Sequence, residues 1–212
     1  MLFSSQIHRE NAMNDTLLLG PQIKELDKPK LVAFCAAIAQ RQFPNFALFS
    51  HLVEFGDAKK MANILDGIWQ SLVPGGAKMN FELQLNKVET NMPDLDAYDM
   101  YGVAPALDAI TCLHATLTCI LEGEYEEAVT IASVSRETVA SFIEVSEGDN
   151  QMSDDQIMRL ISNHQLMEQE DDFQAEVIER LQYAKTLDKE FIAQLKEFST
   201  NQGFSNIGIS VD

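Results

Sequence analysis

The sequence predicts an all-α fold: a compact single-domain bundle of about seven to eight helices around a buried central helix near residues 104–122. Apolar residues recur every three or four positions along most of the chain, which is the spacing of one helix face. Hydrophobic residues make up 46% of the 212 positions, enough for a substantial core. Residues 109–121, AITCLHATLTCIL, carry no formal charge, yet this run is shorter than the roughly 18–20 residues of a membrane span. We therefore expect it to form a helix inside a soluble protein.

The N-terminal part divides into an arm and the first helices. Residues 1–26 are expected to be a loose arm or to hold one short helix. Asp27 then has the character of an N-cap, with Pro29 in the first helical turn, where its missing N–H is tolerated. The apolar run LVAFCAAIAQ follows, and we expect this helix to end near Phe43-Pro44. Asn45 is expected to cap a short second helix.

Two further helices are expected before residue 94. Gly56-Asp57 begins a third helix with a one-sided apolar stripe, and Pro74-Gly75-Gly76 ends it. Asn80 is expected to cap a fourth helix, which Pro93 ends. The stripe of the third helix consists of Met61, Ile64, Leu65, Ile68, Trp69 and Leu72.

Residues 94–108, DLDAYDMYGVAPALD, lead into the buried helix and contain four aspartates. A calcium loop fits poorly, because the sixth position is not glycine and the twelfth is Pro105 instead of glutamate. Capping explains the stretch better: Asp96 or Asp99 is expected to accept N–H bonds from the turn that opens the buried helix. Pro105 fits if it lies in the first turn of that helix.

The second half is also expected to be helical. Residues 125–147 are rich in β-branched side chains, which suits a strand, but they run for more than twenty residues without a turn signal, so a helix is favoured. Ser153 is a strong N-cap with acids after it. One last helix is expected from about Phe173 to Phe198, ending at Asn201-Gln202-Gly203. Residues 27–203 would form the helical domain, with residues 204–212 as an extended tail packed on it.

The charge is strongly acidic and unevenly distributed. The net charge is −18, of which residues 1–100 carry −3 and residues 101–212 carry −15. Such a surface repels phosphate backbones, so we expect no direct binding of nucleic acid. A protein partner with a basic surface is a possible ligand of the acidic half. The N-terminus has no apolar core of signal-peptide length, and we expect a cytoplasmic protein without a membrane segment.

The three cysteines, Cys35, Cys112 and Cys119, lie in apolar surroundings. Cys112 and Cys119 are seven positions apart on one expected helix, so their backbones lie roughly 10 Å from each other and do not suit a disulfide. The odd number and the absence of a Cys-x-x-Cys motif argue against a zinc site. We expect buried, reduced thiols.

The polar residues of the buried helix are the main site candidates. Asp108 is expected to face a polar edge or to find a partner in Tyr101, Lys78 or Arg41, because an unpaired buried charge costs several kcal/mol. His114 points about 120° away from Asp108, so the two do not form a dyad, and we expect a hydrogen-bonded core histidine.

Catalytic and metal-binding patterns are lacking in the sequence. The acidic run at residues 168–172 is expected to be a solvated helix face. No His-Glu-x-x-His, Glu-x-x-His or Gly-x-Ser-x-Gly pattern occurs, so no catalytic residue, metal ligand or cofactor is assigned.

Several strings, spread over residues 28–209, resemble the YjaG-like family of uncharacterised bacterial proteins, a domain of unknown function (DUF416). The resemblance implies a compact all-helical fold and a cytoplasmic bacterial protein, and it brings no assigned reaction. It directs attention to Trp69, Asn80, Tyr101 and Asp108 as candidate ligand-binding residues. The matching strings are Pro44-Asn45, Phe55-Gly56-Asp57, Ile64-Leu65-Asp66-x-Ile68-Trp69, Lys78-x-Asn80-Phe81, Asp99-x-Tyr101-Gly102-Val103-x-Pro105-Ala106-x-Asp108-Ala109, Met152-Ser153-Asp154 and Ser205-Asn206-Ile207-Gly208-Ile209.

Two functions are therefore expected as alternatives. The first is a non-enzymatic helical interaction or regulatory protein that uses its acidic half or an apolar groove. The second is a small-molecule binding protein or enzyme with a pocket near Asp108, Tyr101 and Asn80. The apolar stripe of the last helix faces either its own core or a second copy of the chain, so a homodimer stands as an alternative to a monomer.

Overall fold

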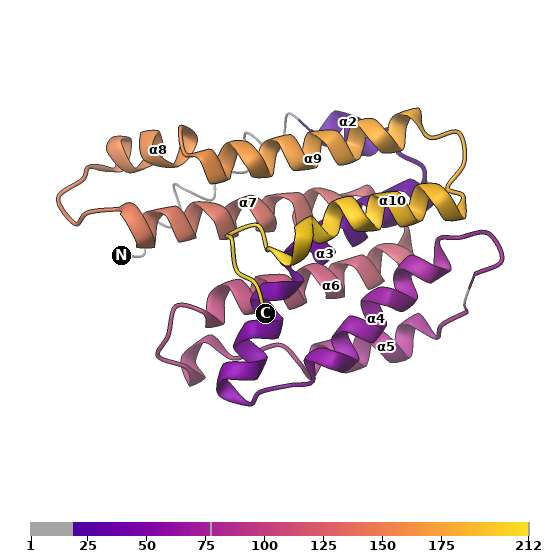
Figure 1. Cartoon of the computed structure of the whole chain (residues 1–212), viewed down its shortest axis with the longest axis horizontal. Helices are drawn as coiled ribbons and strands as arrows, with labels where there is room; N and C mark the ends of the chain where they lie inside the picture. The colour runs from indigo at the N-terminus through magenta and orange to yellow at the C-terminus, as the bar shows by residue number, and fades with distance from the viewer. Residues whose placement is uncertain (1–18, 77, 212) are drawn as a thin grey trace.

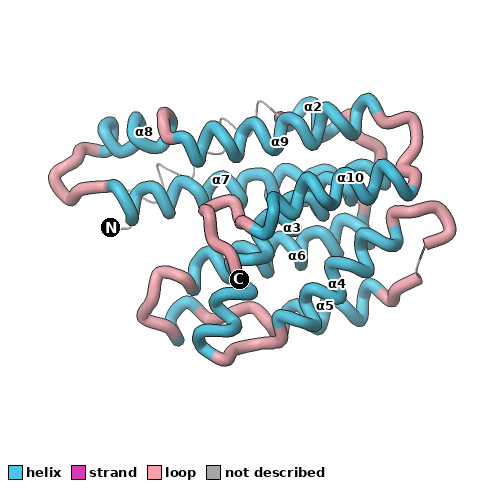
Figure 2. The backbone as a smooth tube through the Cα atoms, in the orientation of Figure 1, coloured by secondary structure: helices cyan, strands magenta, loops and turns pink. Residues whose placement is uncertain are grey.

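The computed structural model describes residues 19–76 and 78–211, and within them the chain is helical without strands (Figures 1 and 2). This confirms the predicted all-α fold. The α-helices are α2 (Gly20–Lys24), α3 (Lys28–Val53), α4 (Ala58–Ser71), α5 (Phe81–Glu89), α6 (Val103–Glu122), α7 (Tyr125–Glu147), α8 (Asp154–Ser162), α9 (Gln165–Tyr183) and α10 (Lys189–Thr200), with short 3-10 helices η1 (Leu95–Ala97) and η2 (Asn201–Gly203).

Helices α3 and α6 form the centre of the main core. Every residue from position 31 to 39 on α3 is buried, which requires neighbours on several sides of that helix. The expected central helix is confirmed as α6, and Pro105 lies in its first turn as predicted. By length and composition α6 resembles a membrane span, with a mean hydropathy of 1.5, but 61% of its apolar window is buried inside the protein. That burial is the arrangement of a core helix.

The prediction that the first main helix ends near Phe43-Pro44 is wrong, because α3 continues through Pro44 to Val53. A proline inside a helix removes one backbone hydrogen bond, but the loss is tolerated here because packing on both sides of Pro44 holds the helix. Phe46 and Phe49, beyond the proline, belong to the same core as Phe34 before it. Asn45 is buried within the helix and does not cap a new one.

The predicted N-caps at Asp27, Asn80 and Ser153 are confirmed, and Asp57, at the predicted start of the third helix, is the N-cap of α4. Their side chains accept backbone N–H bonds from Lys30, Leu83, Gln156 and Lys60, respectively. Ser153 also forms a full capping box, because the side chain of Gln156 accepts from the Ser153 N–H. These caps fix where α3, α4, α5 and α8 begin.

The prediction that Asp96 or Asp99 caps the buried helix is wrong. The N-cap of α6 is Gly102, and no side chain accepts a hydrogen bond there. Backbone carbonyls of Met100 and Tyr101 already accept the N–H groups of Val103 and Ala104, and Pro105 has no N–H to offer. The first turn of α6 therefore needs no aspartate.

The expected last helix is two helices. Helix α9 ends at Tyr183, and α10 begins at Lys189 with Asp188 as its N-cap. Apolar spacing continues through Leu187 and Phe191, and no glycine or proline marks the break. The apolar periodicity therefore predicted one continuous helix where the structure has two. The expected end at Asn201-Gln202-Gly203 is confirmed: Asn201 takes the left-handed conformation that closes α10.

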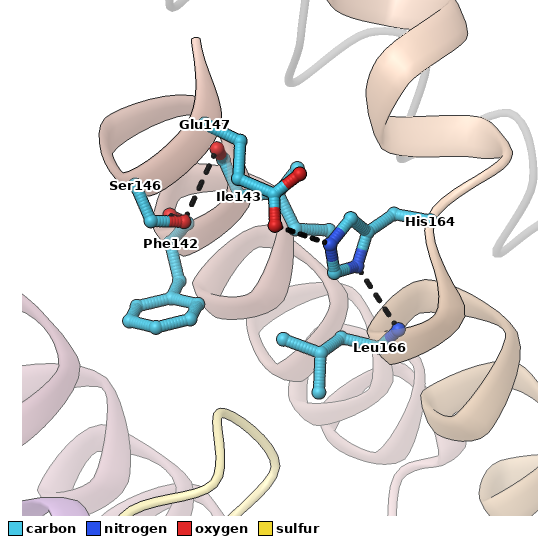
Figure 3. A network of polar contacts seen from close by, with 6 residues as sticks. All are labelled: Phe142, Ile143, Ser146, Glu147, His164 and Leu166. Atoms are coloured by element: carbon cyan, nitrogen blue, oxygen red, sulfur yellow. Dashed lines mark hydrogen bonds and ion pairs between the residues drawn. The ribbon is translucent and has the colours of Figure 1, made fainter.

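A second, smaller apolar cluster joins α7, α8, α9 and the C-terminal tail. His164 links the helices at its edge (Figure 3). Its Nδ1 accepts the N–H of Leu166, so the neutral ring carries its proton on Nε2, which lies 3.0 Å from Oε1 of Glu147 on α7. One imidazole thereby caps α9 and connects it to the end of α7.

The tail lies on the helices and contains a compact turn at residues 205–209. The Ser205 N–H donates to the Ile209 carbonyl at 2.8 Å, and the Ser205 hydroxyl accepts the N–H groups of Ile207 and Ile209. Ser205, Asn206 and Ile207 are buried, so the turn places the polar side chains of Ser205 and Asn206 inside the protein. This places the tail at the site described next.

Candidate functional site

Two of the predicted site residues have structural partners. Trp69 on α4 is buried, and its indole N–H donates to the Gln40 side chain on α3 at 3.0 Å. Asn80 is exposed, and its carbonyl oxygen accepts the N–H of Leu83 as the cap of α5. The contacts of Trp69 and Asn80 thus serve helix packing and helix capping.

Tyr101 and Asp108 lie near each other. Burial, and then the charge of Asp108, raise the pKa of the Tyr101 hydroxyl above its ordinary value. The half-buried Asp108 carboxylate accepts a hydrogen bond of 2.8 Å from Thr138 on α7, which was not among the predicted partners. This bond joins α6 to α7.

A buried polar chain continues behind Thr138. Its hydroxyl also lies 3.2 Å from Oε1 of Gln42 on α3, and the amide of Gln42 donates to the sulfur of Cys112 at 2.9 Å. The Thr138 hydroxyl has a single hydrogen to donate. The charged Asp108 oxygen is a stronger acceptor than the Gln42 amide oxygen, so the hydrogen points to Asp108. Asp108 thus belongs to a polar network that links α3, α6 and α7.

His114 departs from expectation in its position, whereas the cysteines are buried as expected. His114 is partly exposed, with Nε2 3.3 Å from Oε1 of Glu89 on α5, so the expected core histidine is wrong. Cys35, Cys112 and Cys119 are buried free thiols, as predicted. The fold also brings Cys35 and Cys119 near each other, and burial, and then the neighbouring Cys119, raise the pKa of Cys35. Spacing along one helix gave no sign of this pair.

The acidic run at residues 168–172 contains the unexpected site residue. Glu168 and Asp172 are exposed as predicted, but Glu170 is only 2% exposed, so the expectation of a uniformly solvated face is wrong at this position. Residue 170 lies one turn before Phe173 and Gln174, on the inward face of α9. The helix therefore carries a carboxyl group into the protein.

Glu170 is surrounded by hydrogen-bond donors. Gln174 Nε2 donates to its Oε1 at 2.7 Å and also to the carbonyl of Ala132 on α7 at 3.1 Å. The Ser135 hydroxyl on α7 is a further donor to the carboxylate. These bonds partly satisfy the buried charge.

Two arginines balance the acids of this region. Burial raises the pKa of Glu170, and the hydrogen bonds and the charges of Arg41 and Arg136 oppose that rise. Burial likewise lowers the pKa of Arg41, against the attraction of Glu170. Arg136 forms an ion pair with Asp171. The result is two positive and two negative side chains at one junction of α3, α7 and α9.

The tail completes the junction. Asn206 donates through Nδ2 to both the carbonyl and the hydroxyl oxygen of Ser135, each at 3.3 Å, and its Oδ1 accepts from Asn45 on α3 at 3.0 Å. A cavity of about 170 Å³ lies where the tail meets α3 and α9. Its lining comprises Arg41, Leu166, Gln169, Glu170, Asn201, Phe204, Ser205, Asn206 and Gly208.

Polar groups remain available around this cavity. Within the described residues, Nε of Arg41, on the cavity wall, is buried and lacks a hydrogen-bond partner. The same holds for Asn45 Oδ1 and Gln174 Oε1, whose side chains bond the lining residues Asn206 and Glu170. The Arg41 guanidinium stacks on the Phe173 ring at 3.9 Å from its centroid, which holds it in place. The sequence signal for this site was an arginine, a glutamate and an asparagine at positions of otherwise apolar faces, and only the fold shows that they meet.

Comparison with other proteins agrees with this fold. The sequence model of the DUF416 family, described as "Protein of unknown function", matches residues 19–210. The chain is 36% identical over 190 residues to the uncharacterised protein YjaG of Salmonella typhimurium, covering 89% of this chain and 94% of that protein. The YjaG protein of Escherichia coli is also 36% identical, over 189 residues and with the same coverage.

A crystal structure of a DUF416 family protein from Shewanella baltica has the same fold. The two superpose with a TM-score of 0.82 at 32% sequence identity, covering 91% of this chain and 98% of the other. Because the family match and the relatives each span nearly the whole described chain, the protein belongs to the DUF416 family.

Proposed function

We propose that this protein is a non-enzymatic cytoplasmic regulatory protein that binds a small polar molecule in the cavity between Arg41, Glu170 and Asn206. The observation that carries the proposal is a buried carboxyl and a stacked guanidinium on the wall of one cavity. A solely structural polar cluster would be expected to fill its own hydrogen-bonding capacity, since each unsatisfied buried group costs about 1–3 kcal/mol.

The size and charge of the cavity limit its ligand. Its volume of about 170 Å³ is close to the roughly 150 Å³ of a cavity that holds one benzene molecule, so it suits a molecule of that size. Arg41 would bind an anionic group of the ligand, and Glu170 would accept a hydrogen bond from an N–H or O–H donor. A zwitterion, or a small acid that also carries a donor, satisfies both.

The site favours binding over catalysis. Gln174 and Ser135 already donate to Glu170, and no nucleophile–base pair lies on the cavity wall within the described residues. A ligand would instead bridge α3, α9 and the tail. Because Asn206 and Ser205 belong to the tail, a bound ligand would add contacts between the tail and the helices, and firmer attachment of the tail is the regulatory output we propose.

Thermal unfolding with defined probes tests the proposal. The probes are glycine, alanine, serine, acetate, lactate and acetamide. A ligand at 100 times its Kd stabilises by roughly 2.7 kcal/mol, which corresponds to a rise in Tm of roughly 5–10 °C for a chain of this length. We expect such a rise with the zwitterions and a smaller one with acetamide.

Arg41→Ala and Arg180→Ala form a matched pair for this test. Each arginine stacks on a phenylalanine ring, Arg41 on Phe173 and Arg180 on Phe198, but only Arg41 lines the cavity. The proposal expects Arg41→Ala to abolish the ligand-induced shift and Arg180→Ala to retain it. Equal shifts in both variants, or none of these probes stabilising the wild-type protein, would count against the cavity as a ligand site.

A second candidate function is engagement of a basic protein partner, favoured by the charge of −15 on residues 101–212. Glu147, Asp149, Asp154 and Asp155 are exposed around the connection between α7 and α8. A short lysine-rich peptide should bind there and dissociate as salt screens the charges. Asp149→Asn should weaken that binding, whereas Asp66→Asn on α4 should not.

A further inference from the structure

A second hollow lies where the α4–α5 and α9–α10 connections meet the start of α3. Both connections lie at the right of Figure 1. It is a groove of about 810 Å³, much larger than the cavity at Arg41, and the two share no lining residue. Most of its walls are apolar. The apolar lining consists of Pro29, Leu72, Val73, Pro74, Met79, Phe81 and Leu187.

The charges on this groove run against those of the whole protein. Its charged lining residues are Lys30, Lys78, Lys185 and Asp27. Oδ1 of Asp27 is engaged as the cap of α3, where it accepts the backbone N–H of Lys30. The groove is thus locally positive on a chain with a net charge of −18. Lys78 and Lys185 are exposed, and each lies in a loop.

We propose that this groove is a docking site for a short acidic segment of a partner protein. Apolar side chains of the segment would lie against the groove walls, and its carboxylates would lie beside Lys30, Lys78 and Lys185. Complementary charge of this kind selects partners and speeds association. A long polyanion or an anionic membrane surface fits less well, because the remaining acidic surface would repel it.

This docking site differs in place and ligand from the cavity at Arg41 and from the acidic surface that would meet a basic partner. Its failure would therefore leave the proposed function untouched. A fatty acid would place only one carboxylate and one chain in the groove, whereas an acidic peptide places several carboxylates beside the lysines.

Fluorescence anisotropy with a labelled peptide of alternating glutamate and leucine tests the inference. The wild-type protein should bind this peptide, and a version with glutamine in place of glutamate should bind about tenfold more weakly or worse. Raising the salt from about 0.1 M to 1 M shortens the screening length from about 10 Å to 3 Å and should weaken binding of the acidic peptide.

Two charge-matched double variants locate the site. Lys78→Glu with Lys185→Glu reverses two groove charges, whereas Lys59→Glu with Lys60→Glu reverses two exposed charges at the start of α4, away from the groove lining. Both pairs change the net charge equally. We expect the groove pair to weaken binding about tenfold and the α4 pair to change it less than about twofold.

Four results would overturn the inference: no binding of the acidic peptide to the wild-type protein, equal losses in the two double variants, equal affinity for the glutamine peptide, or displacement of the acidic peptide by palmitate with higher affinity. Circular dichroism confirms that each variant is folded before its affinity is compared, and the exposed positions of all four lysines favour that outcome.

Discussion

Asn45 and Asn206 lie 161 positions apart, and the Nδ2 of Asn45 donates a hydrogen bond of 3.0 Å to Oδ1 of Asn206 inside the protein. Asn206 also donates to Ser135 on α7, so its side chain bonds both α3 and α7. The tail is therefore held by a specific buried polar contact as well as by the apolar packing of Ile207.

Asn206→Ala should lower the free energy of unfolding by about 1–3 kcal/mol, because it leaves the buried amide of Asn45 without its acceptor. Urea denaturation measures the change. Val211→Ala is the control in the same tail, since Val211 is 48% exposed and its truncation should cost less than about 0.5 kcal/mol. Equal effects of the two substitutions would show that the asparagine pair contributes nothing specific.

Glu170→Gln should change how stability depends on pH. Burial raises the pKa of Glu170 above its ordinary value of 4.5, so the folded protein holds this proton to higher pH than the unfolded chain does. The resulting stabilisation is present below pH 4.5 and is lost as the pH rises through the raised pKa. The loss is about 1.4 kcal/mol for each unit of upward shift.

The glutamine variant lacks this titration. Its free energy of unfolding, relative to the wild type, should therefore rise from pH 4.5 towards neutral pH and then level off. Chemical denaturation at several pH values follows the difference, with Glu168→Gln as the exposed control on the same helix. A difference that stays constant with pH, or falls, contradicts a raised pKa at Glu170.

Local signals predicted much of the fold because they act over a few residues. Asp27, Asp57, Asn80 and Ser153 each stand before an apolar-periodic run, and each caps a helix. The break between α9 and α10 was missed because Leu187 keeps the apolar spacing across it. Pro44 gave the opposite error, since packing of distant helices outweighs a local breaker.

The site was harder to predict because its parts are far apart in sequence. Arg41, Glu170 and Asn206 come from α3, α9 and the tail, and nothing in any one of these segments shows that the three side chains meet. Glu170 lies in a run of acidic residues, and the sequence does not show that its side chain alone points inward while Glu168 and Asp172 are exposed. Asp108 was predicted to need a partner, but the identity of Thr138 depended on how α7 packs on α6.

The bond between Asp108 and Thr138 should appear as a coupling energy. Asp108→Ala and Thr138→Val each remove one partner, and each should destabilise by about 1–3 kcal/mol. The double variant should cost less than the sum by about 0.5–3 kcal/mol, as measured by urea denaturation in a double-mutant cycle. Additive costs would mean that the 2.8 Å contact makes no net contribution.

Asn80→Ala should cost about 1 kcal/mol through loss of the α5 cap, while Asn80→Ser should restore most of it. Asn86→Ala, at an exposed position within α5, controls for the effect of alanine on the helix itself and should be neutral or slightly stabilising. If Asn80→Ser were as unstable as Asn80→Ala, the capping role of Asn80 would be excluded.

Pro44→Ala should stabilise the protein by about 1–3 kcal/mol. Pro44 lies inside α3 and cannot donate to the Gln40 carbonyl one turn earlier, whereas alanine supplies that N–H and removes the ring clash. Part of the gain, about 0.4–1 kcal/mol, is offset because alanine frees the unfolded chain. Pro29→Ala is the contrasting control: Pro29 lies in the first turn of the same helix, where no donor is missed, so alanine should destabilise slightly. Thermal and urea unfolding give both signs, and a Pro44→Ala variant less stable than the wild type would show that the proline shapes α3 for the packing of Phe46 and Phe49 and is not merely tolerated.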